Sequence, residues 1–476
     1  MWTLPRTKEK LPVYKQLVRH VEAAIGAGEL APGERLPAER TLARLLNVNR
    51  STVIHALDEL ADRGVLVRKR GSGTYVNREK WGVQSYARIN WQEPPALLPV
   101  RRDGPFQREA AIVREKAARG EAALYDLSRD DLAPDLLPAM SLPDRSWEEI
   151  VRAEQGDEAA HLGLASFRCS VARFLHREAG LSVPPDEILI TSGSRQAIFL
   201  ITQCLLKVGD AVGVEAPSYF YSLPVFQAAG LRLFALPMDS EGVVPEELEH
   251  IAERRSLKMI FLNPVFHNPT GTVMSDARKK AVLAFCAAKR IPIVEDDAYS
   301  FLSFGARGGL TPLKAGDKDS QVIYTGSLSS YAGRNVRAGW LVAPPGVIAR
   351  LASARHMMDA GLSVLPQILA QEYLEHMACA HLPQLRRALA QRAEGLASAL
   401  REMFGNALAF TSPPGGLYLY ATAQRDKEYA PVQNEFLRRG IIPALGEDFG
   451  DTRPSFRLNH SLFMKSAGKT GELLQS

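Results

Sequence analysis

A run of small residues marks a candidate anion site in the middle of the chain. Residues 191–195 (Thr-Ser-Gly-Ser-Arg) follow an apolar stretch that predicts a strand, and they precede a helical pattern at 197–206. Free backbone N–H groups at the start of a helix, combined with small side chains, are a natural phosphate site. We therefore predict that Ser194 and the backbone of Arg195 bind a phosphate group.

A second segment strengthens this prediction. Residues 324–340 (Tyr-Thr-Gly-Ser-Leu-Ser-Ser-Tyr-Ala-Gly-Arg-Asn-Val-Arg-Ala-Gly-Trp) resemble the cofactor loop of fold-type I pyridoxal phosphate (PLP) aminotransferases. The resemblance implies that Ser327 and Ser329 join the phosphate site and that Arg337 is the counter-ion of the phosphate.

Four more motifs match that family in the expected order, within residues 215–457. Glu215-Ala-Pro-Ser-Tyr219 implies that Tyr219, or else Phe220 or Tyr221, covers a face of the pyridine ring. The Asn-Pro-Thr-Gly turn at 268–271 implies that Asn268 binds the phenolic oxygen. Further along, the resemblance assigns the pyridinium nitrogen to Asp296, the phenolate to Tyr299 and a substrate carboxylate to Arg457.

The chain departs from this family at Ser330. The resemblance places the Schiff-base lysine at this position, and no lysine lies between Lys318 and Lys427. A hydroxyl cannot form an imine, and loss of a positioned general base typically costs ~10²–10⁴ in rate. Phosphate binding, ring stacking and the Asp296 pair do not need the lysine, so PLP or a PLP–amine adduct is expected to bind non-covalently if it binds.

Three explanations for Ser330 remain open at this point. The chain is a natural regulator without the lysine, or its lysine was replaced by engineering to trap a ligand, or it is a working enzyme that uses another amine. The first is the interpretation we favour, since the rest of the cradle is present.

The elements around these motifs predict an α/β body. Apolar stretches at 187–191, 211–215, 259–262, 292–295, 321–324 and 337–342 predict strands, and helical patterns lie between most of them. We expect a large aminotransferase-like domain over 123–343. A smaller C-terminal domain is expected over 344–476, with helices near 344–375 and 382–404. Residues 79–122 show no sustained period and predict a linker, with one charged helix at 107–119.

The first 78 residues predict a different domain. Helical patterns at 16–25, 39–46 and 51–61 are followed by a basic hairpin at 65–76 with a glycine-rich tip. Two helices around a tight turn and a basic hairpin make a winged helix-turn-helix, which places a helix N-terminus in the major groove of DNA. Its predicted core includes Leu42, Leu45, Leu46, Val53, Leu57 and Leu60. The predicted DNA contacts are Arg50, Ser51, Thr52, Arg68, Lys69 and Arg70.

The phrases Gly33-Glu-Arg-Leu-Pro-Ala-Glu-Arg40 and Arg70-Gly-Ser-Gly-Thr74 resemble the DNA-binding domain of the GntR family of bacterial repressors. The resemblance adds Arg35, Arg40 and Gly73 to the expected operator contacts. A GntR head on an aminotransferase-like body resembles the MocR/GabR type of GntR regulators, which implies a head-to-tail homodimer, operator DNA and a small-molecule effector.

Charge and cysteine usage agree with this prediction. The net charge is only +5, but residues 1–80 hold 15 Lys and Arg against 9 Asp and Glu, which favours an anionic partner at that end. The four cysteines lie far apart and suit neither a zinc site nor a disulfide framework. We expect no metal, no membrane span and a cytoplasmic location.

Two other function classes stay open. The chain is a PLP-dependent aminotransferase with an accessory domain, or its body is a dimerisation platform that binds no ligand. A reducible lysine adduct with amino-acid turnover would favour the enzyme, and DNA binding that no ligand alters would favour the platform.

Overall fold

The computed structural model describes residues 11–26, 30, 33–69, 71–77, 104–121, 123–141, 144, 146–152, 160–305, 310–359 and 361–463. The chain divides into two units, residues 1–99 and 100–476. Each unit is built around its own buried core.

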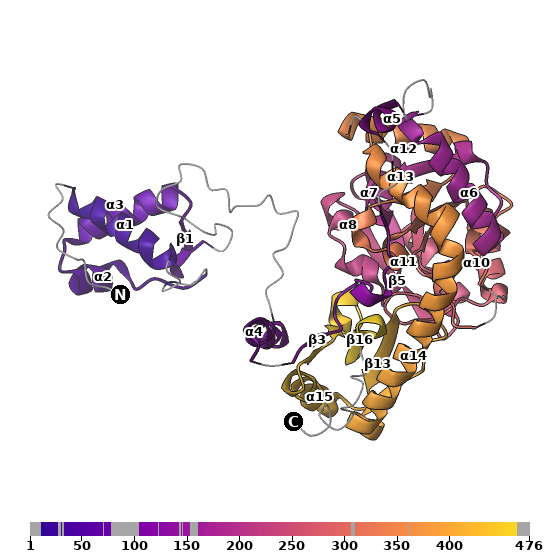
Figure 1. Ribbon diagram of the computed structural model, residues 1–476. Helices are drawn as coiled ribbons and strands as arrows, with labels where there is room; N and C mark the ends of the chain where they lie inside the picture. The colour runs from indigo at the N-terminus through magenta and orange to yellow at the C-terminus, as the bar shows by residue number, and fades with distance from the viewer. Residues whose placement is uncertain are drawn as a thin grey trace. The chain divides into compact units, whose positions relative to one another are not determined.

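The first unit is the predicted winged helix (Figure 1). Its elements are α1 Val13–Gly26, α2 Glu39–Leu46, α3 Arg50–Asp62, β1 Leu66–Lys69 and β2 Gly73–Val76, with β1 and β2 antiparallel. Helix α2 ends at Asn47, which adopts the left-handed conformation that asparagine tolerates and so allows the tight turn into α3. The core prediction was wrong at Leu45, which is 47% exposed, because Leu42 and Leu46 form the buried stripe of α2 and Leu45 lies on its flank.

The second unit is built on an eight-stranded sheet with the order β4-β11-β10-β9-β8-β5-β6-β7. The bounds are β4 Ile188–Thr191, β5 Ala211–Ala216, β6 Arg232–Asp239, β7 Gly242–Val243, β8 Met259–Leu262, β9 Ile293–Asp297, β10 Val322–Ser327 and β11 Gly339–Val342. Strands β10, β9, β8, β5 and β6 are parallel to one another, and β11 is antiparallel to both of its neighbours.

Helices pack on both faces of this sheet. Alternate residues of β4 enter two different cores, since Ile188 and Ile190 lie in one and Leu189 in the other. The helices are α5 Trp147–Arg152, α6 Ala165–Ala179, α7 Ser194–Leu205, α8 Val225–Ala228, α9 Pro245–Arg255, α10 Asp276–Lys289, α11 Ser329–Ala332, α12 Pro345–Met358, α13 Val364–Glu372 and α14 Ala378–Phe404.

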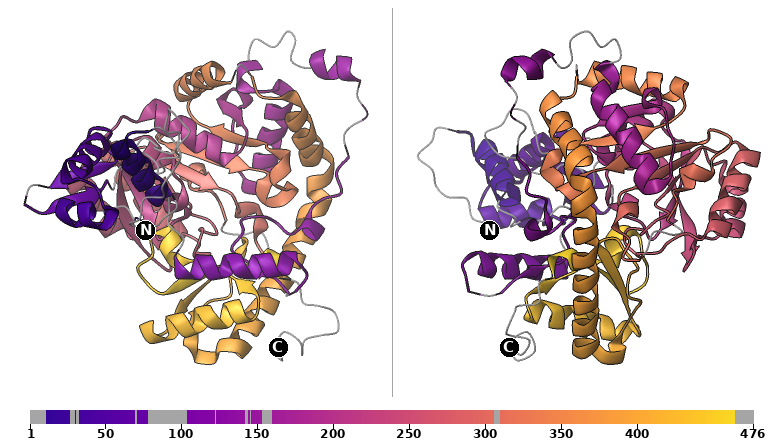
Figure 2. Two further views of the ribbon diagram at one scale, coloured as in Figure 1. Left: turned by 90° about the vertical axis from the view of Figure 1, so that its left-hand side faces the viewer. Right: turned by 45° about the vertical axis from the view of Figure 1, so that its right-hand side comes forward.

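The smaller domain contains a second sheet with the order β12-β13-β16-β15 and helix α15 Asp426–Arg438. Its strands are β12 Leu408–Phe410, β13 Tyr418–Ala423, β15 Ala444–Leu445 and β16 Ser455–Asn459, and β14 Ile441–Ile442 pairs separately with β3 Tyr125–Asp126. Helix α14 runs along the body and joins the two sheets (Figures 1 and 2). Its Leu382 packs in the core of the large domain, and its Leu400 packs in that of the small domain.

Several predicted boundaries moved. Strands β9 and β10 continue to Asp297 and Ser327, because their ladder pairs Thr325 with Asp296 and Gly326 with Asp297. Strand β11 begins only at Gly339, since Arg337 has a left-handed backbone (φ 49°) that no strand accommodates.

The helices also differ from their predicted extents. The helix expected at 344–375 is two helices, α12 and α13, separated near Gly361; Pro366 lies in the first turn of α13, where proline is tolerated. Residues 105–118 of the expected linker form helix α4 Pro105–Ala118, whose Phe106 and Ala110 are buried in the core of the smaller domain.

Candidate functional site

Most of the predicted pocket residues gather at one edge of the large sheet. The parallel strands β5, β8, β9 and β10 all end there, and the antiparallel β11 begins there. Ligands of open α/β sheets bind outside the carboxyl ends of such strands. This edge therefore holds the candidate pocket.

The phosphate end of the pocket comprises Ser194, Arg195, Ser327, Ser329 and Arg337. Ser194 begins α7 directly after Gly193, which has φ 120°. A Cβ atom at Gly193 would stand 3.8 Å from Ser327 Oγ, so the start of α7 lies beside the end of β10. Ser327 Oγ donates to Ser329 Oγ at 3.1 Å and accepts from the Ser329 N–H at 3.2 Å.

Both arginines of the phosphate end are exposed. Arg337 makes no hydrogen bond or ion pair with any residue that the structure describes. The side chain of Arg195 is 73% exposed and its one ion pair among those residues is a long contact of 3.8 Å with Asp130. The positive charge at this end is thus available to an external anion.

The ring site is formed by Tyr219, Asp296 and Thr325. Asp296 is 2% exposed, and its two carboxylate oxygens accept hydrogen bonds from the hydroxyls of Tyr219 and Thr325. Burial is the main cause that raises the pKa of Asp296 to about 6. A buried carboxylate that has only hydroxyl partners would gain from a cationic partner such as a pyridinium N–H.

Asn268 and Tyr299 lie next to this ring site. Asn263, at the end of β8, fixes the local backbone: its side chain donates to the Asp296 carbonyl at 2.7 Å and accepts from the Asn268 N–H at 2.7 Å. The backbone N–H of Tyr219 donates to the Asn268 carbonyl at 3.0 Å. The hydroxyl of Tyr299 lies 3.1 Å from that of Tyr418, and burial raises the pKa of Tyr299.

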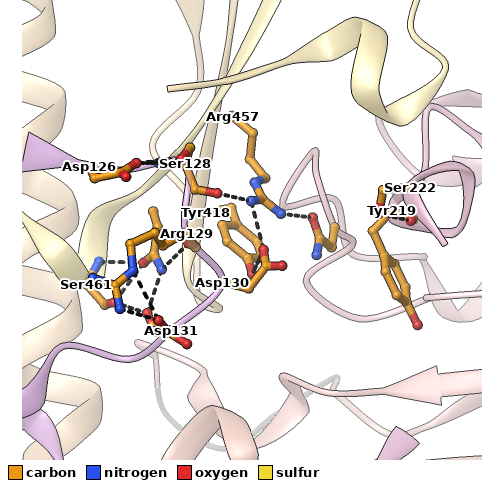
Figure 3. Close-up of polar contacts among 12 residues, drawn as sticks. Asp126, Ser128, Arg129, Asp130, Asp131, Tyr219, Ser222, Tyr418, Arg457 and Ser461 are labelled. Atoms are coloured by element: carbon orange, nitrogen blue, oxygen red, sulfur yellow. Dashed lines mark hydrogen bonds and ion pairs between the residues drawn. The ribbon is translucent and has the colours of Figure 1, made fainter. Parts of the chain in front are cut away.

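The carboxylate end of the pocket comprises Ser128, Asp130, Asn268, Tyr418 and Arg457. Arg457 is 3% exposed, and its guanidinium lies 4.3 Å from the centre of the Tyr418 ring. It donates to Asn268 Oδ1 at 2.9 Å and to the Ser128 carbonyl at 2.7 Å, and it forms an ion pair of 2.8 Å with Asp130 (Figure 3). The predicted carboxylate-binding arginine therefore already has a carboxylate from its own chain.

Sequence reasoning missed Ser128, Asp130, Asn263, Thr325 and Tyr418. Asp130 is the most consequential of these, because it contacts both Arg457 and Arg195. It belongs to a short charged run in a loop, and such runs are usually solvated. Nothing in the sequence around it points to a buried arginine more than 300 residues away.

Ser330 is the second residue of α11 and is half-buried. Two of the lysines that precede Ser330 along the chain are bonded elsewhere. Lys314 Nζ donates to the Val322 carbonyl at the opposite end of β10, roughly 16 Å from the strand's last residue at 3.3 Å per residue. Lys279 Nζ donates to the Thr311 carbonyl.

The structure describes all but one of the predicted DNA-binding residues and brings several of them together. Two of them, Thr52 and Gly73, are half-buried, and Arg70 lies outside the described residues. The others are exposed: Arg35, Arg40, Arg50, Ser51, Arg68 and Lys69. Arg50 and Arg68 both pair with Glu39, at 3.1 and 3.7 Å, so the start of α3 and strand β1 share one charged surface. Gly73 has a positive φ (123°) that favours glycine, and a Cβ there would stand 2.9 Å from Arg35 Nε, so the wing lies against the Arg35 side chain.

The residues present fit the binding of a phosphorylated pyridine such as PLP. The phosphate end offers serines, a helix N-terminus and two exposed arginines. The buried Asp296 lacks a cation, and Asn268 and Tyr299 supply polar groups beside it. Among the described residues there is no group of His, Cys, Asp and Glu that could hold a metal ion, and no helix long and apolar enough to span a membrane.

Comparison with known proteins places both units in families. Residues 158–457 match the family model for aminotransferase class I and II, and residues 13–76 match that for bacterial regulatory proteins of the gntR family. The crystal structure of Pyrococcus horikoshii kynurenine aminotransferase in complex with PMP is similar over 76% of this chain and 90% of its own, with 26% identity and a TM-score of 0.65. LysN, the α-aminoadipate aminotransferase of Thermus thermophilus complexed with N-(5′-phosphopyridoxyl)-L-leucine, is similar over 78% of this chain and 94% of its own, with 26% identity and a TM-score of 0.64.

Two regulators are similar over most of the chain. YisV of Bacillus subtilis, an uncharacterized HTH-type transcriptional regulator, is 35% identical over 463 residues, which are 96% of this chain and 94% of YisV. The HTH-type transcriptional regulator NorG of Staphylococcus aureus is 26% identical over 89% of this chain and 95% of its own. The chain therefore belongs to the family of HTH-type transcriptional regulators in which a gntR winged helix precedes a class I and II aminotransferase domain.

Proposed function

We propose that the protein is a transcription regulator that binds operator DNA through its winged helix and binds a pyridoxal phosphate-type ligand non-covalently in its aminotransferase-like domain. The observation that carries the proposal is the hydroxyl of Ser330 at the position that the family resemblance assigns to the Schiff-base lysine. The phosphate end and the ring site around it are retained. This combination favours binding over turnover.

In this proposal each group of the pocket has a binding role. Ser194, Ser327 and Ser329 donate to the phosphate, and Arg337 supplies its counter-charge. Asp296 pairs with the ring nitrogen, Tyr219 covers the ring and Asn268 and Tyr299 contact the phenolic oxygen. When bound, the ligand's pyridinium ring would supply an electron sink, but Ser330 has no amine to hold it or to move a proton there.

The DNA-binding role rests on the exposed basic surface of the winged helix. Arg50 and Ser51 stand at the free N-terminus of α3, and Arg68 and Lys69 flank it on β1. Two such heads in a homodimer would read two half-sites, and a ligand in the body would shift their spacing. A regulator of this kind acts in the cytoplasm, where the DNA is.

A binding experiment with the protein's own upstream DNA tests the regulatory role. We expect Arg50→Ala to weaken binding by roughly tenfold and to reduce the slope of log K against log salt by about 1. The matched control is Lys280→Ala, which removes one exposed positive charge from α10 in the body. Equal effects of the two variants, or no sequence-selective binding, would count against this role.

Borohydride reduction in the presence of PLP tests the non-covalent mode. We expect no reduced phosphopyridoxyl group on the wild-type chain by intact-mass spectrometry, and one such group on Ser330→Lys. Asn335→Lys is the matched control, since it adds an exposed amine five residues further along the same segment without changing a residue assigned to the phosphate, and we expect no adduct there. A reduced adduct on the wild-type chain contradicts the proposal.

The second candidate function is a PLP-dependent aminotransferase, and the retained Asp296, Asn268 and Tyr299 favour it. An assay of amino-acid turnover with PLP separates the two functions. Sustained product release by the wild-type protein would establish the enzyme, whereas ligand binding without turnover supports the regulator.

A further inference from the structure

The surroundings of Arg457 leave little room for a ligand's carboxylate. Its guanidinium contacts two rings, 4.3 Å from the centre of Tyr418 and 4.7 Å from that of Phe449. Along its edge, Nη2 contacts both the Ser128 carbonyl and Asp130 Oδ1, and Nη1 donates to Asn268. Among the described residues, the buried Nε–H has no hydrogen-bond partner and Nη1 has a single one.

The backbone around Asp130 holds its carboxylate beside Arg457. Arg457 bonds the carbonyl of Ser128, and the side-chain amide of the buried Asn459 donates to the carbonyls of Arg129 and Asp131 at 2.9 and 2.8 Å (Figure 3). The residues on both sides of Asp130 are thus bonded to strand β16. This arrangement fixes the loop so that the Asp130 side chain meets Arg457.

Asp130 also faces the other polar groups of the pocket. The hydroxyl of Tyr418 donates to Asp130 Oδ1 at 3.2 Å, and Arg195 of the phosphate end lies 3.8 Å from its second oxygen. Its side chain is 52% exposed. Asp130 therefore lies between the phosphate end and Arg457, and it is reachable by a ligand that enters the pocket.

We infer that Asp130 determines the ligand class, because its carboxylate takes the place at Arg457 that a ligand's carboxylate would need. The pocket then selects pyridoxyl phosphates without a carboxylate, such as pyridoxamine phosphate or adducts of simple amines, over adducts of amino acids. A ligand carboxylate at Arg457 would have to displace Asp130 or lie beside it. Two carboxylates that contact the same guanidinium repel each other. This inference rests on the proposed function, since it names the ligand of that pocket.

Two stable compounds that differ only by the carboxylate test this inference. N-(5′-phosphopyridoxyl)-L-leucine carries it, and N-(5′-phosphopyridoxyl)-3-methylbutylamine lacks it. Titration calorimetry with the full chain should show that the wild-type protein binds the amine compound at least roughly tenfold more tightly. Asp130→Asn should reduce or reverse this preference, because the charge of Arg457 is then no longer balanced by a carboxylate of its own chain.

Asp131→Asn is the matched control. Its carboxylate belongs to the same loop but pairs with Arg129 and Arg334 rather than with Arg457. We expect this variant to keep the wild-type preference. If it altered the preference as Asp130→Asn does, the effect would belong to the loop and the inference would be wrong.

The remaining outcomes separate the inference from the proposed function. Equal binding of both compounds by the wild-type chain, or tighter binding of the leucine compound, overturns the inference and leaves the proposed function standing. Failure of both compounds and of pyridoxamine phosphate to bind overturns the proposed function, and the inference falls with it.

Discussion

The two ends of the pocket differ in whether their arginines already have partners in the chain. At the phosphate end, Arg337 is exposed and has no partner among the described residues, and Arg195 has only a long contact. At the carboxylate end, Arg457 is almost fully buried and is bonded to three groups of its own chain. The first end requires an anion from outside, whereas the second already contains one.

This difference defines the ligand more sharply than the family resemblance does. A substrate of an amino-acid aminotransferase has to satisfy both ends at once, with a cofactor phosphate at one and a carboxylate at the other. Here the chain supplies its own carboxylate at the second end. A ligand with a single anionic group therefore matches the pocket, in which only the phosphate end has arginines without a close anionic partner among the described residues.

The largest expected effect concerns stability at the carboxylate end. Arg457→Met would leave the Ser128 carbonyl and the Asn268 side chain without their donor, and since each acceptor left unsatisfied out of water costs about 1–3 kcal/mol, the expected loss is about 3 kcal/mol. Asp130→Asn should cost less than about 1 kcal/mol, because half of that side chain is exposed. Urea denaturation of the two variants measures this asymmetry.

An equal loss in both variants would show that the Arg457–Asp130 pair acts as one buried structural unit. In that case the carboxylate end would not be open to a ligand at all, and the comparison between the two ends would lose its functional meaning.

The residues predicted for the phosphate end and the ring site gather in the structure because they lie at or just after the ends of strands of one sheet. Ser194, Ser327 and Asp296 lie at the ends of apolar stretches, and the parallel sheet brings such ends to one edge. The resemblance identified these residues because each motif is contiguous in the sequence.

The carboxylate end could not be predicted in the same way. The contact between Asp130 and Arg457 joins a loop after β3 to strand β16, and it depends on how the small sheet packs against the start of the body. Likewise, the left-handed backbone of Arg337 and the exposure of Leu45 depend on tertiary packing. Local patterns carry no information about such contacts.

The next largest effect concerns affinity at the phosphate end. We expect Arg337→Ala to weaken binding of pyridoxamine phosphate by about 2–4 kcal/mol, since it removes the counter-charge of the phosphate. Arg334→Ala is the control, because Arg334 is three residues away, 72% exposed and paired with Asp131. Titration calorimetry should show little change in that variant, and similar losses in both would refute the assignment of Arg337.

The smallest expected effect concerns the middle of the pocket, where Asp296 differs from Asp130 in having no cationic partner among the described residues. The pKa of Asp296 is about 6 in the folded chain, against an ordinary value of 3.8. Ionisation therefore disfavours the folded state by up to about 3 kcal/mol above pH 6, and this cost vanishes below about pH 4. Asp296→Asn should accordingly stabilise the body at pH 8 by about 1–3 kcal/mol and leave its stability nearly unchanged at pH 4.

The same variant should bind pyridoxamine phosphate more weakly, because the ring nitrogen loses its ionic partner. A gain in stability combined with a loss of affinity is typical of a residue kept for binding rather than for folding. Asp451→Asn is the control: burial alone would raise the pKa of that carboxylate, but hydrogen bonds from Arg453 and Tyr420 outweigh it and lower the pKa, so the change should give no such gain at pH 8. If denaturation curves showed the same gain for Asp296→Asn at pH 4 and pH 8, the buried carboxylate would not be the cause, and the contrast between an unpaired Asp296 and a paired Asp130 would fail.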